Sequence, residues 1–230
     1  MLLKRAAAMS VALGLAVLAA TPSEAALRLA IYTGTLDFGT DVTGEFGAPL
    51  TDLTGKAFVA RFTYNTARGQ RVTVPGAYDV AYGGAGIGTS NPILKSTLTI
   101  AGVTRDFVPR YTGTVQTSSG IHHNSSGYGS DASYVYQHSL YMSAFTPLPL
   151  ANSIEAVFPE RDSVPAGGGL FQLWTFDKSG NFLNQARGGL VPLTFEVSAV
   201  PDSASWGLMI LGFGLLGSSL RYRRRMNIGI

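Results

Sequence analysis

Three histidines lie close together in the chain and are its best candidates for metal binding. His122 and His123 are adjacent, and His138 follows, so that all three fall within 17 positions. Neutral imidazoles bind zinc or copper, and Asp131 is a possible fourth ligand. Adjacent side chains of an extended segment point apart, however, so His122 and His123 are not expected to share an ion. A solvated polar loop is the favoured interpretation, with a metal site as the alternative.

Four carboxylates lie in a glycine-rich stretch, at Asp37, Asp41, Glu45 and Asp52. Calcium takes several oxygen ligands from such loops, but this spacing does not fit an EF-hand. The alternative is turn chemistry, in which Asp and Thr side chains bond to nearby backbone groups. We expect no tight metal site and no cofactor, with Asp37, Asp41, His122 and His123 as the weak candidate ligands.

Aromatic residues gather between positions 128 and 174. Tyr134, Tyr136 and His138 would share one face of a strand, whereas Tyr141 would lie on the other face. Such rings can form a platform for carbohydrate, but Tyr and Phe are also ordinary core residues of β-sandwiches. Both interpretations remain open. The set comprises Tyr128, Tyr134, Tyr136, Tyr141, Phe171 and Trp174.

Motifs of known catalytic sites are missing from the sequence. The run Gly83-Gly84-Ala85-Gly86-Ile87-Gly88 lacks the Gly-Lys-Ser/Thr ending of a phosphate loop, and we expect it to be a hairpin tip. There is no Gly-x-Ser-x-Gly, no cysteine, and no carboxylate pair that stands out. We therefore predict no catalytic residues and no enzyme activity, and keep a hydrolase with an unseen site as a third alternative.

The elements that must position these residues are β-strands. Apolar residues alternate with polar ones over 58–64, 94–100 and 193–199, which predicts strands with one buried face. No stretch of residues 26–199 shows apolar residues at the spacing of a helix face. The fold prediction is all-β: an antiparallel β-sandwich, jelly-roll-like in one form. Residues 121–133 are predicted to be a long surface loop. Further strands are expected over 29–36, 72–80, 105–111, 133–145, 153–158 and 170–177, and turns at 67–69, 90–92, 166–169 and 178–181.

The first 25 residues have the form of a secretory signal peptide. Lys4 and Arg5 precede an apolar run, and Ser23 and Ala25 are small residues at the cleavage positions. The translocon is thus an expected partner.

The last part of the chain has three sections, and it predicts a short membrane helix. A polar segment begins with Pro201, Asp202 and Ser203 and ends at Trp206. The uncharged stretch that follows would be about 22 Å long if it formed a helix, which is short for a membrane span. The arginines place that end in the cytoplasm and the body outside. The anchor residues are Met209, Ile210, Gly212, Phe213, Gly214, Gly217 and Leu220, and the stop-transfer residues are Arg221, Arg223, Arg224 and Arg225.

These residues resemble the PEP-CTERM sorting signal (also named ice-binding protein C-terminal domain), in its Pro-Glu-Pro-x-x-Trp-Ala variant. Pro201 and Trp206 match, whereas Asp202, Ser203 and Gly207 depart from the motif. The resemblance implies an exported protein of a Gram-negative, exopolysaccharide-producing bacterium. It also implies a transient stage in the inner membrane, cleavage by an exosortase, and a final place at the cell surface or outside the cell. An ordinary C-terminal membrane anchor is the alternative.

Charge separates the body from these ends. Six of the 17 Lys and Arg residues lie in the end segments, which leaves the body with 11 basic and 12 acidic residues. A net charge of −1 gives no electrostatic footprint for nucleic acid. The predicted organisation is a signal peptide (1–25), an all-β body (26–199), a sorting signal (200–225) and a tail (226–230). We expect a non-enzymatic surface or matrix protein, with an exopolysaccharide-binding module as the alternative.

Overall fold

The computed structural model describes residues 27–107, 110–130, 133–145, 153–162, 166–200 and 213. The predicted signal peptide, sorting motif and arginine cluster fall outside the described residues. Residues 26–199 form one compact unit. Within the described part of the chain, no helix has the length and apolar character that crossing a membrane requires.

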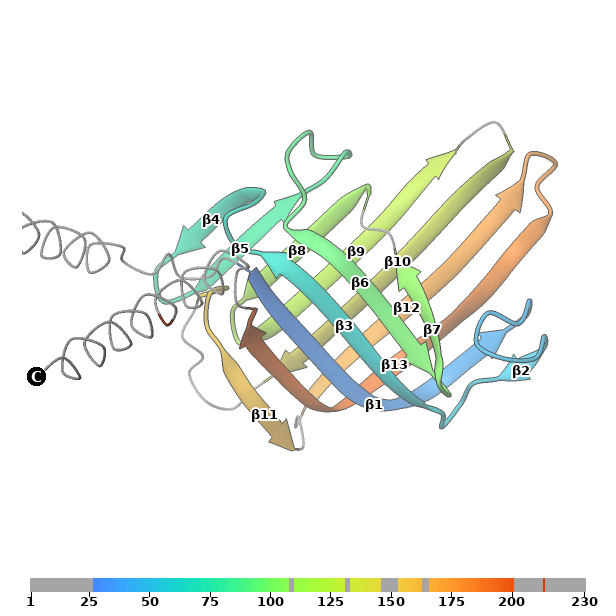
Figure 1. Cartoon of the computed structure of the whole chain (residues 1–230), viewed down its shortest axis with the longest axis horizontal. Helices are drawn as coiled ribbons and strands as arrows, with labels where there is room; N and C mark the ends of the chain where they lie inside the picture. The colour runs from blue at the N-terminus through green and yellow to red at the C-terminus, as the bar shows by residue number, and fades with distance from the viewer. Residues whose placement is uncertain are drawn as a thin grey trace, which may run out of the picture. The chain divides into compact units, whose positions relative to one another are not determined.

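The body is all-β and antiparallel, as the alternating pattern predicts. Its strands join in one sheet, in the order β4-β5-β8-β9-β10-β12-β13-β1-β3-β6-β7, with β11 beside β13 and β2 beside β1 (Figure 1). The strands are β1 (Leu27–Asp41), β2 (Thr51–Asp52), β3 (Ala57–Asn65), β4 (Gln70–Val74), β5 (Tyr78–Gly83), β6 (Ile93–Ile100), β7 (Val103–Phe107), β8 (Thr112–Thr117), β9 (Gly120–Ser130), β10 (Tyr134–Phe145), β11 (Phe158–Asp162), β12 (Ala166–Asp177) and β13 (Phe182–Ala199).

The sheet curls until its two halves face each other. Tyr32 on β1 and His123 on β9 are four strands apart in the sheet order, a distance of about 19 Å in a flat sheet. Their side chains nevertheless meet at 2.7 Å. Ser96 on β6 likewise bonds Ser125 on β9 at 2.7 Å. Figure 1 shows β1, β3 and β6 crossing in front of β8, β9 and β10. The predicted sandwich of two sheets is not confirmed, because one hydrogen-bonded sheet supplies both layers.

The core lies on the inner face of the curled sheet, and it is filled by the side chains of every second residue along the strands. The buried residues of β3 are Phe58, Ala60, Phe62 and Tyr64, and the residues between them are more exposed. Burying a large apolar side chain contributes about 1.5–3 kcal/mol, so these alternating rows supply most of the driving force. On β10 the inner positions are even, with Leu140, Met142 and Ala144 buried. On β9 they are odd, with Ile121 and His123 buried.

The prediction of a long loop over 121–133 is wrong. Residues 120–130 form strand β9, which pairs with β8 and β10. The composition of Ser, Gly, Asn and His is typical of loops, but here the inner positions are small or polar for a packing reason. Ser125 fits beneath β6 because it bonds to Ser96.

Four other boundaries differ from the sequence prediction. Residues 166–169 begin strand β12 and are not a turn. A Cβ atom on Gly169 would lie 2.4 Å from the sulfur of Met142, so this glycine serves packing. The strand predicted over 72–80 is broken by a turn at 75–77, where Gly76 has φ +76°. Residues 154–155 form a turn, and β11 starts only at Phe158. Residues 110–111 separate β7 from β8.

Candidate functional site

His123 lies in the core, with no exposed surface. Its ring stacks on Phe62 with 5.3 Å between ring centres, and Tyr64 lies 4.9 Å away. Burial, together with the neighbouring His122, lowers the pKa of His123 to about 3. The imidazole is therefore neutral. His122 points to the outer face, as the alternation of an extended segment predicts.

The two candidate aspartates serve the backbone. Asp41 is buried, and its carboxylate accepts hydrogen bonds from the N–H groups of Gly44, Glu45 and Phe46 at 2.7–2.9 Å. Asp37 is exposed and accepts one from the N–H of Phe38. This is the turn chemistry that the sequence offered as the alternative to calcium. Among the described residues, no group of three or more His, Asp or Glu side chains could hold a metal ion. Asp131 lies outside the described residues.

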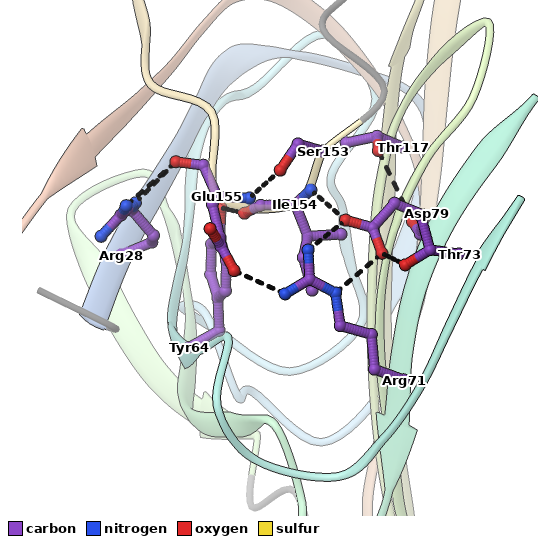
Figure 2. A network of polar contacts seen from close by, with 9 residues as sticks. All are labelled: Arg28, Tyr64, Arg71, Thr73, Asp79, Thr117, Ser153, Ile154 and Glu155. Atoms are coloured by element: carbon purple, nitrogen blue, oxygen red, sulfur yellow. Dashed lines mark hydrogen bonds and ion pairs between the residues drawn. The ribbon is translucent and has the colours of Figure 1, made fainter. Parts of the chain in front are cut away.

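A buried carboxylate organises a polar network at one end of the curl (Figure 2). Asp79 on β5 is fully buried and receives two hydrogen bonds from the Arg71 guanidinium, at 2.9 and 2.7 Å. Thr73 and the backbone N–H of Ile154 donate two more. Burial raises the pKa of Asp79, but these donors outweigh it, so the pKa lies below its ordinary value.

The same network holds the segment 153–155 against the body. Arg71 also contacts the carboxylate of Glu155 at 2.5 Å. Arg28 donates to the carbonyl of Glu155 at 3.0–3.1 Å, and Tyr64 donates to the carbonyl of Ile154 at 3.4 Å (Figure 2). Ile154 is fully buried and closes this end of the core. Since each member is paired within the network, we assign it a structural role.

The outer face of β8, β9 and β10 carries a shallow depression of about 370 Å³. Tyr141 forms one wall, and its hydroxyl lies 3.1 Å from Nδ1 of His122. The two rings are stacked, 6.3 Å between centres, which holds the tyrosine in place. Burial lowers the pKa of His122, so the imidazole is neutral at pH 7. The remaining lining residues are Thr114, Gln116 and Asn124.

A second depression of about 370 Å³ lies over β9 and β10, mostly on their outer face, although two of its lining residues, Gly127 and His138, occupy inner positions. Two exposed tyrosines mark it, Tyr111 and Tyr128, whose rings meet edge to face at 5.8 Å. Burial lowers the pKa of His138, although Glu45 opposes this, so His138 is also neutral at pH 7. The remaining lining residues are Ser126, Gly127, Gln137 and Ser139.

The aromatic residues that could have formed one platform are therefore split between the two faces of the sheet. Tyr134, Tyr136 and His138 occupy inner positions of β10, and Tyr141 an outer one, as the alternation predicts. Phe171 does not belong to an exposed platform, because it is buried in the core against Phe46. Trp174 lies on the outer face of β12 but packs against other rings there, with Phe176 and Phe182 at 6.3–6.4 Å.

Sequence reasoning missed most residues of the two depressions. Thr114, Gln116 and Asn124 stand on outer positions of paired strands, in the register Thr114↔Asn124 and Gln116↔His122. The signal that could have found those on β9 is a weak alternation over 121–128, with His, Asn, Ser and Tyr at the outer positions and Ile, His, Ser and Gly at the inner ones. It was obscured by the loop-like composition of that stretch.

The chain matches no family model, no curated protein and no solved structure. The resemblance of residues 200–225 to a sorting signal therefore remains a prediction, and the function of the body must be argued from its own surface.

Proposed function

We propose that this chain is an exported, non-enzymatic surface protein whose β-body binds carbohydrate on the outer face of β8, β9 and β10. One observation carries the proposal. The two depressions combine tyrosine rings with side-chain amides and hydroxyls, at Asn124, Gln116, Gln137 and Ser139 among others. Rings offer an apolar face to the C–H surface of a sugar, and amides can donate and accept hydrogen bonds with its hydroxyls.

Pre-organisation of the site supports the same reading. Tyr141 is held by its contact with His122, and Phe145 packs edge to face on that histidine at 5.5 Å. Strands β8, β9 and β10 lie within the sheet, with paired neighbours on both sides. Side chains on such strands lose little further freedom when a ligand binds, which favours affinity from few contacts.

The direct test is glycan-array binding by the full chain, followed by titration calorimetry on the best ligand. Tyr141→Ala should lower the affinity about tenfold, the equivalent of about 1.4 kcal/mol. Tyr134→Ala is the matched control. It lies on the same strand with a similar exposed fraction, 46% against 36%, but on the opposite face, and should change the affinity less than twofold. Release of reducing sugar from the bound glycan would favour the hydrolase instead.

Export and sorting form the second part of the proposal. The pattern of residues supports it: a charged start with Ser23 and Ala25, then Trp206, the apolar stretch and the arginines of the C-terminal segment. We infer that the translocon exports the chain, that the apolar stretch spans the inner membrane as a short helix, and that an exosortase cuts near Pro201. The body, freed from the membrane, would then reach polysaccharide at the cell surface or beyond it.

A further inference from the structure

The two depressions follow one another along the same pair of strands. Asn124 in the first and Ser126 in the second are successive outer positions of β9, and Tyr141 and Ser139 are successive outer positions of β10. Two residues along a strand span about 7 Å, so the depressions adjoin. In the β9–β10 register Tyr141 pairs with Asn124. Tyr128 stands four residues beyond Asn124 on β9, about 13 Å further along the strand.

Among the described residues, no ionised side chain lines either depression. The two titratable residues other than tyrosine are His122 and His138, and burial keeps both neutral at pH 7. Arg187 lies two strands from Ser139, because Gln172 stands between them in the register. This separation is about 10 Å. Arg110 is the exposed cation next to Tyr111 in the chain, and it is absent from the lining. Phosphate, sulfate and carboxylate groups are usually bound by arginine or lysine, and neither is found among the described residues that line these depressions.

We infer that the two depressions are adjoining subsites of one groove along β9 and β10, which takes an extended, uncharged glycan chain. Tyr141 anchors the chain in the first subsite, and Tyr128, braced by Tyr111, anchors it in the second. The inference rests on the proposed carbohydrate-binding function and adds the charge and the minimum length of the ligand. A single sugar fills one subsite, whereas a chain must be long enough to span both.

Calorimetry on the full chain tests this with neutral cello-, malto-, xylo- and manno-oligosaccharides, from disaccharide to hexasaccharide. We expect the best series to gain at least tenfold in affinity between the shortest and the longest member. Tyr141→Ala and Tyr128→Ala should each cost about tenfold with the hexasaccharide, and Tyr134→Ala less than twofold. With the disaccharide, only one of the two anchor substitutions should have an effect.

Three results would overturn the inference while leaving the proposed function standing. The first is equal affinity at all lengths, and the second is hexasaccharide binding that is insensitive to one of the two anchor substitutions. The third is binding of polyuronate oligosaccharides as tight as that of the neutral series and equally sensitive to both substitutions. Polyuronate binding that neither substitution weakens would be assigned to the arginine-rich C-terminal segment and would leave the neutral series to decide. A chain that binds no oligosaccharide of either kind would refute the proposed function itself.

Discussion

The hydroxyl of Tyr32 on β1 lies 2.7 Å from Nδ1 of His123 on β9, inside the core and with no exposed surface on either residue. This bond joins the two halves of the curled sheet. The hydroxyl donates to Nδ1 when the imidazole carries its proton on Nε2. Nε2 has no hydrogen-bond partner among the described residues. Burial raises the pKa of Tyr32 well above its usual value, so the phenol keeps its proton throughout the ordinary pH range.

Acid should destabilise the body through His123. In the unfolded chain this histidine titrates near 6.5, whereas in the folded body its pKa is about 3. Between these values the unfolded state binds more protons, so stability is fully present above about pH 6.5 and falls as the pH drops toward 3. The loss should amount to a few kcal/mol. Urea unfolding at a series of pH values measures it.

The control for this pH effect is His123→Phe, which removes the titrating group and keeps a flat ring. Its unfolding free energy should depend less on pH between 6.5 and 4 than that of the wild type. Equal slopes in the two proteins would mean that His123 does not titrate in this way. Asp79 also loses its stabilising contribution in acid, because its pKa is lowered, and this part should persist in both proteins.

Asp79→Asn should destabilise the body by about 2 kcal/mol, because it removes the buried one of the two anions that Arg71 contacts and weakens the hold on residues 153–155. The figure is below that of a fully buried pair, since the Arg71 side chain is 37% exposed. The control is Asp106→Asn, which breaks an ion pair with Lys95 that is exposed and 3.7 Å long. That change should stay within about 0.5 kcal/mol in chemical denaturation. Equal effects of the two substitutions would contradict the role assigned to the network.

Two glycines on neighbouring strands should respond differently to alanine. A Cβ atom on Gly188 would lie 2.7 Å from both the Phe171 ring and the carbonyl oxygen of Phe38. Gly188→Ala should therefore cost about 1–3 kcal/mol through overpacking. A Cβ atom on Gly168 would meet nothing within 4 Å, so Gly168→Ala should be nearly neutral. Thermal unfolding followed by circular dichroism compares them, and a neutral Gly188→Ala would show that the core there can relax.

The mature protein should begin at Ala26 and end near residue 200. Intact-mass measurement of protein purified from the native host tests this expectation. Replacing Arg221, Arg223, Arg224 and Arg225 with neutral residues should impair processing, because these residues stop transfer in the membrane. A mass that still includes Trp206 to Ile230, in a host that makes an exosortase, would mean that the segment is an anchor and not a sorting signal.

The strand class was predictable from sequence because burial on one face imposes period two, as in Phe58 to Tyr64 and Phe195 to Val197. The curl was not, because it depends on pairs such as Tyr32 and His123, which are 91 residues apart. Strand β9 was missed for a related reason. Its inner serine and glycine positions fit beneath the facing half of the sheet. That half comes from distant parts of the sequence, so the local residue pattern of β9 does not predict the contact.

Only part of the outer-face site was predictable. The alternation predicted that Tyr141 lies on the opposite face of its strand from Tyr134 and Tyr136, and the structure confirms this. Thr114 and Asn124 meet only through the register of β8 with β9, and the sequence alone does not contain that register. Phe171 and Tyr141 are both aromatic and stand on paired strands, yet one belongs to the core and the other to the surface, because they occupy opposite faces.

The most direct test of carbohydrate binding on this face is an NMR titration of the isotope-labelled protein with a neutral hexasaccharide. We expect the largest amide shift changes to cluster on β8, β9 and β10, around Tyr141 and Tyr128. Residues of the facing strands β3 and β6 should change little. Changes centred on those strands or on the turn at 178–181, or no changes at millimolar ligand, would contradict carbohydrate binding on this face.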